Sequence, residues 1–172
     1  MTTRPKISNS QIDPCADVHP SAVIEGDVRI GASCRIGAGT YIDGRLRPVR
    51  IGANTTVGAQ CVIEATVSEE VEIGEWVTVQ PGVVVQGARI ADWADVGARC
   101  VLADGSCIGG WASVADGSVL PPRQTVPDRY RGAGNPLRMI GEHANEENQA
   151  VLRERKRQLV ARGDLCSRLQ CG

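Results

Sequence analysis

The stretch from Val71 to Ser106 reads VEIGEWVTVQPGVVVQGARIADWADVGARCVLADGS, and its spacing decides the fold. A six-residue period fits neither an α-helix nor an alternating strand. It fits a chain wound as a triangular prism, with one block on each side and three blocks in each coil. The stretch therefore predicts a left-handed parallel β-helix, a solenoid whose aliphatic residues point inward. The aliphatic residue that opens each block is Ile73, Val79, Val85, Ile90, Val96 or Leu102. Successive ones are six positions apart, except that Val85 and Ile90 are five apart.

The same spacing extends in both directions from this stretch, and the blocks that begin at Val18, Ile24 and Ile30 open the first, second and third sides of the prism. Eighteen blocks, three to a coil, predict about six coils between residues 15 and 130. The fold class is thus an all-β solenoid with a C-terminal α-helix. The remaining blocks begin at Ile36, Ile42, Ile51, Val57, Ile63, Ile108, Val114, Leu120 and Val126.

The segments outside this pattern are predicted as separate units. Residues 1–14 form an N-terminal extension, residues 131–163 a loop followed by an α-helix over about 137–162, and residues 164–172 a loose tail. The basic run RERKRQ, residues 153–158, is interpreted as a solvated helix face, and contact with a partner is the alternative.

The composition excludes several function classes. Lys and Arg total 19 and Asp and Glu total 20, so the net charge of −1 argues against a nucleic-acid partner, which would attract a basic excess. No stretch approaches the ~18 apolar residues of a membrane span, and no apolar region typical of a secretory signal opens the chain. The seven cysteines are interpreted as reduced thiols of a cytoplasmic protein. Cys34, Cys61 and Cys100 occupy the fifth position of a block, which must be small because the prism is narrow.

One position in successive coils forms a column along the outside of such a solenoid, with strands ~4.8 Å apart. All three tryptophans, Trp76, Trp93 and Trp111, fall in one column, at the fourth position of the third-side blocks. They are interpreted as the surface on which the C-terminal helix packs, because that helix must bury an apolar face. The alternative is a stacking platform for a ligand that contains a ring.

The second side carries a polar column, at the position that follows its inward aliphatic residue. Asp43 and Glu64 are predicted to lie one coil apart in this column. Because two close carboxylates disfavour double ionisation, one of their pKa values is expected to rise, although Arg45 could neutralise one of them. Such a pair could act as acid and base, or form a salt-bridge cluster between subunits. The whole column reads Glu25, Asp43, Glu64, Gln86, Ala103 and Pro121.

Three segments resemble the γ-class carbonic anhydrases. They are VHPSAVIEGDVRIGASCRIGAGTYIDGRLRPVRIGANTTVGAQCVIEA (residues 18–65), the stretch quoted first, and GNPLRMIGEHANEE (residues 134–147), so the resemblance covers roughly residues 15–148. The nine-residue block at Ile42 and the five-residue block at Val85 stand where that family has them. The resemblance implies a homotrimer of left-handed β-helices, each with a C-terminal helix. It also implies sites between subunits, where three histidines from two chains hold zinc.

The zinc ligands of that family are replaced in this chain. Matched block by block, the three histidines fall on Glu64, Pro81 and Gln86. The family's Arg-Gly-Asp segment reads Asp-Gly-Arg at residues 43–45, and the Gln-Asp pair beside the zinc is Gly-Ala at residues 58–59. Because catalytic zinc needs three N, O or S ligands and an open position, no metal and no cofactor are assigned, and CO2 hydration is not expected.

The sequence therefore predicts an enzyme that keeps the site between subunits for another reaction. Glu64 and Asp43 are the predicted catalytic residues, and the ligand is a small molecule, such as one that bears a carboxylate or an acyl group. The wider superfamily suggests acyl transfer or acyl hydrolysis. The predicted substrate-binding residues are Arg45 and Gln86 from one chain and Gln80 and Arg99 from the next.

Three alternatives stay open. Metal-free relatives of the γ-class family serve as structural subunits, so the chain could be a non-catalytic scaffold trimer in a larger assembly. Asp43 and Glu64 could bind a hard cation. A zinc carbonic anhydrase with unusual ligands is the third alternative. The two histidines do not favour it, because His19 is interpreted as a residue of a surface turn and His143 as a residue of the helical segment.

Overall fold

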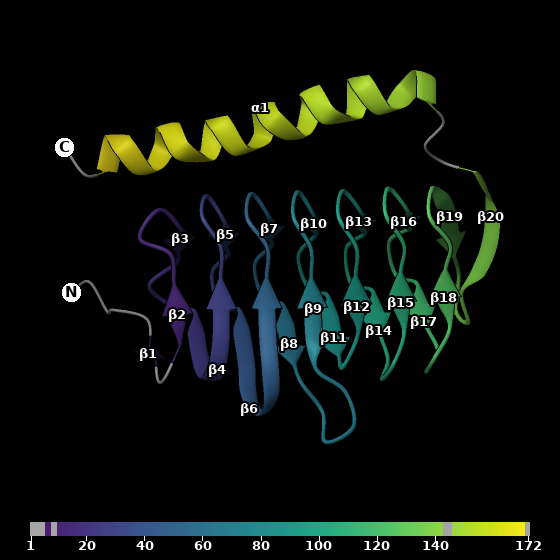
Figure 1. Ribbon diagram of the computed structural model, residues 1–172, viewed down its shortest axis with the longest axis horizontal. Coiled ribbons are helices and arrows are strands. Elements are labelled where there is room, and N and C mark those ends of the chain that lie inside the picture. Colours follow the sequence, from purple (N-terminus) through teal and green to yellow (C-terminus); the bar gives the residue numbers. More distant parts are fainter. Residues whose placement is uncertain (1–5, 8–9, 143–145, 171–172) are drawn as a thin grey trace.

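The computed structural model describes residues 6–7, 10–142 and 146–170 of the 172-residue chain. The chain winds into a parallel β-helix of stacked three-sided coils. A long helix, α1 (Glu146–Gln170), runs back along the coils from the last toward the first (Figure 1). This helix is too polar to cross a membrane.

The first side is a ladder of seven parallel strands, which the antiparallel strand β20 (Arg138–Glu142) extends at its C-terminal end. Two residues suffice for most of these strands because each one pairs with the coils on both sides of it. The seven strands are β3 (Asp17–Val18), β5 (Arg35–Ile36), β7 (Thr56–Val57), β10 (Thr78–Val79), β13 (Asp95–Val96), β16 (Ser113–Val114) and β19 (Tyr130–Ala133).

The second and third sides share one sheet, because two long strands, β4 (Val23–Ile30) and β6 (Tyr41–Ile51), bend around the corner between them. The second side also contains β1 (Lys6–Ile7), β8 (Val62–Glu64), β11 (Val84–Gln86), β14 (Val101–Leu102) and β17 (Val119–Leu120). The third side also contains β2 (Gln11–Ile12), β9 (Val71–Ile73), β12 (Arg89–Ile90), β15 (Cys107–Ile108) and β18 (Thr125–Val126).

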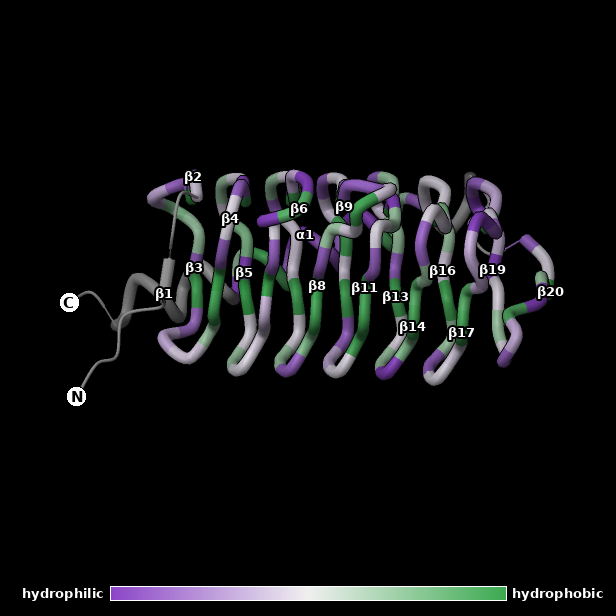
Figure 2. The backbone as a smooth tube through the Cα atoms, turned by 90° about the horizontal axis from the view of Figure 1, so that it is seen from below, coloured by the Kyte–Doolittle hydropathy of each residue, from purple (hydrophilic) through white to green (hydrophobic). Residues whose placement is uncertain are grey.

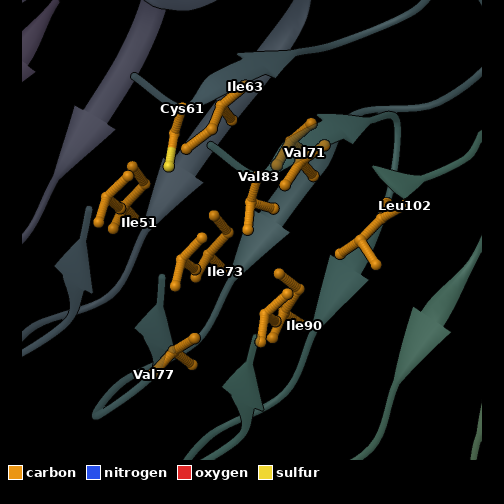
Figure 3. Close-up of a cluster of buried hydrophobic side chains, with 14 of the residues drawn as sticks. Ile51, Cys61, Ile63, Val71, Ile73, Val77, Val83, Ile90 and Leu102 are labelled. Atoms are coloured by element: carbon orange, nitrogen blue, oxygen red, sulfur yellow. The ribbon is translucent and has the colours of Figure 1, made fainter. Parts of the chain in front are cut away.

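The aliphatic residues of the six-residue period form the core, as predicted. Ile42 and Ile63 are 0% exposed, and hydrophobic residues recur along every coil (Figure 2). The side chains from the three sides point into the interior between the strands (Figure 3). Cys61 is buried with them, and burial raises the pKa of its thiol, so it behaves as a small apolar side chain.

The solenoid is longer at both ends than the sequence analysis predicted. Strands β1 and β2 pair in parallel with β4, so part of residues 1–14 belongs to a coil and is not a separate extension. At the other end, β19 adds a strand to the first side. Each side therefore has seven parallel strands in the described residues, where six were predicted. Ile12 lies six residues before Val18 and already continues the period.

The prediction of a helix that begins near residue 137 is wrong. Leu137 is 3% exposed and closes the open end of the core, and strand β20 follows it. Ile140, expected on the helix, is 65% exposed on β20. The helix begins at Glu146 and continues through most of the predicted tail to Gln170. His143, Ala144 and Cys171 lie outside the described residues.

The tryptophan column is present and lies beneath the helix. Trp93 stacks on Trp76 and on Trp111, with ring centroids 4.9 and 4.8 Å apart and nearly parallel planes. The guanidinium of Arg153 lies 5.2 Å from the centroid of Trp111 and 5.9 Å from that of Trp93. The helix lies over this column, as predicted, but the contacts come from the cations Arg153 and Lys156 and not from an apolar face.

The basic run 153–158 is not a purely solvated face, because Lys156 is 6% exposed. Its Nζ donates to the carbonyl oxygens of Trp76, Trp93 and Ala94 at 2.8, 2.9 and 3.0 Å. It also pairs with Asp95 Oδ1 at 2.8 Å. Lys156 therefore fixes the register of α1 on two consecutive coils.

Candidate active site

The polar column of the second side stands in register, as predicted. Asp43 on β6 pairs with Glu64 on β8, and Glu64 pairs with Gln86 on β11. Side chains alternate along a strand, so the residue that follows an inward aliphatic residue points outward. These three residues, called the second-side row below, are only partly exposed.

Arg45 holds Asp43 in its ionised form. The guanidinium Nη2 donates to Asp43 Oδ2 at 2.6 Å and Nε donates to Oδ1 at 2.9 Å. The Tyr41 hydroxyl lies 3.2 Å from Asp43 Oδ2 and 3.2 Å from Glu25 Oε2, and so links the two carboxylates. The hydrogen bonds from Arg45 outweigh burial and lower the pKa of Asp43. The predicted rise in pKa is therefore wrong for Asp43.

This lowered pKa predicts an acid-dependent contribution to stability. Because the pKa of Asp43 is lower in the folded than in the unfolded chain, the pairing stabilises the fold above the ordinary value of 3.8 and is lost as pH falls through the folded value. We expect the midpoint of urea unfolding to fall more steeply between pH 5 and pH 3 in the wild type than in Arg45→Met. Parallel pH profiles for the two proteins would show that the pair adds nothing.

Glu64 differs from Asp43 in having one oxygen without a partner. Gln86 Nε2 donates to Glu64 Oε1 at 2.6 Å. In the part of the chain that the structure describes, Oε2 has no hydrogen-bond partner. The amide therefore fixes the orientation of the carboxylate and leaves its second oxygen open to another group.

Gln80 and Arg99 do not join the second-side row within one chain. Gln80 lines a cavity between the first side and α1, together with Asp95 and Lys156. Arg99 lies exposed in the turn between the first and second sides, where it has a φ of 55°. Both were assigned to the neighbouring subunit, so their role stays a prediction.

The residues at the positions of the family's histidines do not fit zinc. Pro81 has no donor atom in its side chain, and the amide of Gln86 occupies Glu64 Oε1. Among the described residues, no three His, Cys, Asp or Glu side chains gather as a metal site. The guanidinium on Asp43 also opposes a hard cation between Asp43 and Glu64, because it occupies the oxygens and carries positive charge.

The sequence analysis did not give Tyr41 a role in this network. Tyr41 lies two residues before Asp43, so the alternation of a strand places both side chains on the outer surface. That spacing could have identified it. Arg45 Nη2 also donates to the Tyr41 hydroxyl at 3.0 Å, so Tyr41 adds a neutral link between the charges of this network.

No protein-family model matches the chain, but it is similar to several known proteins. The mitochondrial γ-carbonic anhydrase 2 of Arabidopsis thaliana is 30% identical over 142 residues, which are 79% of this chain and 51% of that protein. The carnitine operon protein CaiE of Escherichia coli K12 is 29% identical over 136 residues, 79% of this chain and 69% of that one. The chain spans about half the length of the curated plant relatives it matches.

A solved structure from Bacillus cereus, provisionally assigned as an acetyltransferase, superposes with a TM-score of 0.85 and 25% identity over 93% of this chain and 92% of that chain. This agreement extends along both proteins and includes the stacked coils that carry the second-side row. The chain therefore shares the left-handed β-helix of this solved structure, and its sequence is similar to the γ-carbonic anhydrases and to CaiE.

Proposed function

We propose that the chain forms a cytoplasmic homotrimer with a small-molecule site between subunits, and that this site catalyses acyl transfer or acyl hydrolysis without zinc. The observation that carries the proposal is Glu64, which Gln86 fixes at 2.6 Å through one oxygen while the other oxygen has no partner in the described residues. A carboxylate held in this way can accept a proton from a nucleophile. The free thiols of the described cysteines support a reducing compartment.

In the proposed mechanism, Glu64 Oε2 takes the proton of a hydroxyl, amine or water as that group attacks an acyl carbonyl. The same proton then passes to the leaving group when the tetrahedral intermediate collapses. The Gln86 amide keeps Glu64 oriented through both steps. Arg45, which is 61% exposed, binds a carboxylate of the substrate with its remaining donors.

In this proposal Asp43 positions Arg45, whereas Glu64 transfers the proton. Its oxygens are held by Arg45, so it orients the guanidinium and is less suited to move a proton. Arg99 and Gln80 of the neighbouring chain complete the substrate contacts. The resemblance to an acetyltransferase structure supports the acyl chemistry, and the donors at the histidine positions disfavour a hydratase.

A scaffold trimer is the second candidate. The closed network of Arg45, Asp43 and Tyr41 favours it, because these groups satisfy one another without a ligand. If the scaffold function is correct, Arg45→Ala dissociates the trimer. If the site is catalytic, the trimer survives Arg45→Ala and substrate affinity falls.

The proposed enzyme is tested with p-nitrophenyl acetate as the acyl donor and nitrophenolate release as the signal. Glu64→Gln is expected to lower the rate about 10²-fold to 10⁴-fold, the usual contribution of a general base. Glu72→Gln is the matched control, since Glu72 is an exposed outward residue in a third-side strand. Native mass spectrometry confirms that each variant keeps the wild-type oligomer.

Two outcomes would contradict the enzyme. One is a Glu64→Gln variant that keeps the wild-type rate. The other is a wild-type protein that releases nitrophenolate no faster than buffer does, together with dissociation of the trimer by Arg45→Ala. The second result would favour the scaffold.

A further inference from the structure

A cavity of about 540 Å³ lies between the first side and α1, away from the second-side row. Its volume is within the usual range of ~300–1,000 Å³ for sites that bind small ligands. Leu152 and Leu159 of α1 supply aliphatic surface to one wall, whereas Val96 and Val114 of the first side are buried core residues. The cavity therefore has room and apolar area for a short organic molecule.

Three of the charged groups in the cavity already have partners. Lys156 Nζ lies 2.8 Å from Asp95 Oδ1, and its other contacts are backbone carbonyls. Asp116 accepts a hydrogen bond from the Ala98 backbone N–H at 2.8 Å. These groups hold the walls of the cavity together.

Two arginines that line the cavity have no partner. Arg131 comes from β19 and Arg155 from α1, so they approach from different walls. Both residues are exposed, and neither guanidinium makes a hydrogen bond or an ion pair in the described part of the chain. With Lys156 already neutralised by Asp95, two guanidinium groups face one carboxylate, that of Asp116. The excess of positive charge favours an anion and disfavours a cation.

The wall of the cavity on the first side is a row of outward residues beneath the helix. Thr78, Asp95, Ser113 and Arg131 are register partners on successive strands, and all but Ser113 line the cavity. Ser113 is 9% exposed, and its hydroxyl oxygen is buried without a hydrogen-bond partner. Because Ser113 does not line the cavity, this buried hydroxyl is not a contact for a ligand there.

We propose that this cavity binds a short aliphatic carboxylate, with its anionic group between Arg131 and Arg155 and its chain against Leu152 and Leu159. Planar guanidinium groups bind carboxylates through paired, charge-assisted hydrogen bonds. The site lies on another side of the prism from Glu64. Gln80 lines this cavity and is also assigned to the catalytic site of the neighbouring subunit, so the two sites adjoin in the proposed trimer while Glu64 belongs only to the second side.

The test is isothermal titration calorimetry, which measures the affinity of the full-length protein for sodium hexanoate. Arg131→Gln and Arg155→Gln are each expected to weaken binding about tenfold or more, because each removes a charge-assisted hydrogen bond. Arg157→Gln is the matched control, since Arg157 is an exposed arginine on the same helix and does not line the cavity. Leu152→Trp, which fills the cavity from the helix, is expected to abolish binding.

Hexanol keeps the aliphatic chain of the proposed ligand without its charge, and inorganic phosphate keeps a negative charge without the chain. Both are expected to bind more weakly than hexanoate. The proposal is wrong if hexanol binds as well as hexanoate, if phosphate does so, or if neither Arg131→Gln nor Arg155→Gln changes the affinity. Binding to Leu152→Trp at wild-type affinity would also overturn it. Glu64→Gln is expected to bind hexanoate normally, and loss of binding there would move the site to the second side.

Discussion

Replacing Lys156 by methionine is expected to release α1 from the solenoid. The Lys156 side chain is 7% exposed, and its Nζ is surrounded by three backbone carbonyls and Asp95. Methionine keeps the aliphatic stem and removes all these donors. The Asp95 carboxylate that remains is 39% exposed, so water compensates for part of the lost ion pair. A hydrogen bond from a charged donor contributes about 1.5–3 kcal/mol. We expect a loss of this size in the free energy of helix docking.

The release of the helix is measured by tryptophan fluorescence and limited proteolysis. Without the docked helix, the stacked rings lose the cover of Arg153, so the emission is expected to shift to longer wavelength. Trypsin is expected to cut the helix while the coils resist. Arg157→Met, at an exposed position of the same helix, is the control and is expected to behave as the wild type. An unchanged spectrum and digestion pattern in Lys156→Met would show that other contacts hold α1.

Asp95 explains how a lysine can occupy this position. Burial lowers the pKa of the Lys156 amine, and the Asp95 carboxylate acts in the opposite direction. A charged amine can donate to the carbonyls and to Asp95 together, whereas a neutral amine has fewer donors. The carboxylate therefore preserves the form of lysine that holds two coils and the helix together.

The second large effect is expected from Gly26→Ala. Gly26 has a φ of +82°, and a Cβ at this position would overlap the backbone of Gly44 on the neighbouring strand. Backbone atoms in the middle of a stacked ladder cannot turn aside as a flexible side chain can. We expect a loss of about 3 kcal/mol or more in the free energy of unfolding, from steric overlap together with the strain of positive φ.

Gly117→Ala separates these two causes. Gly117 has a φ of +68°, and a Cβ there would meet nothing within 4 Å. Its expected cost is therefore only the ~1–2 kcal/mol of a left-handed conformation. Urea unfolding measures both variants. Equal losses for the two would mean that the approach of β4 to β6 is not as tight as described.

Most of the solenoid could be predicted because its geometry repeats. A six-residue period places Ile42 and Ile63 inside and the next residue outside, so the register of Asp43 with Glu64 follows from counting. The ends were harder to predict because they break the repeat. Leu137 is apolar because it closes the core, and the sequence around it resembles the start of a helix.

The chemical state of the candidate site depends on contacts that the period does not determine. The pKa of Asp43 is lowered because Arg45 folds back onto it, and a count of residues shows only that the two are near. Lys156 was expected on a solvated surface, since nothing in the run RERKRQ distinguishes the lysine that lies against the solenoid. Such contacts depend on where the helix lies relative to the coils.

The central claim is a zinc-free trimer with its site between subunits. Native mass spectrometry of the protein as purified, with no metal added, tests it most directly. The account predicts an assembly of three times the 18.2-kDa chain without stoichiometric metal, and any added organic mass would identify the ligand. A monomer, or a trimer that carries three zinc ions, would contradict the account.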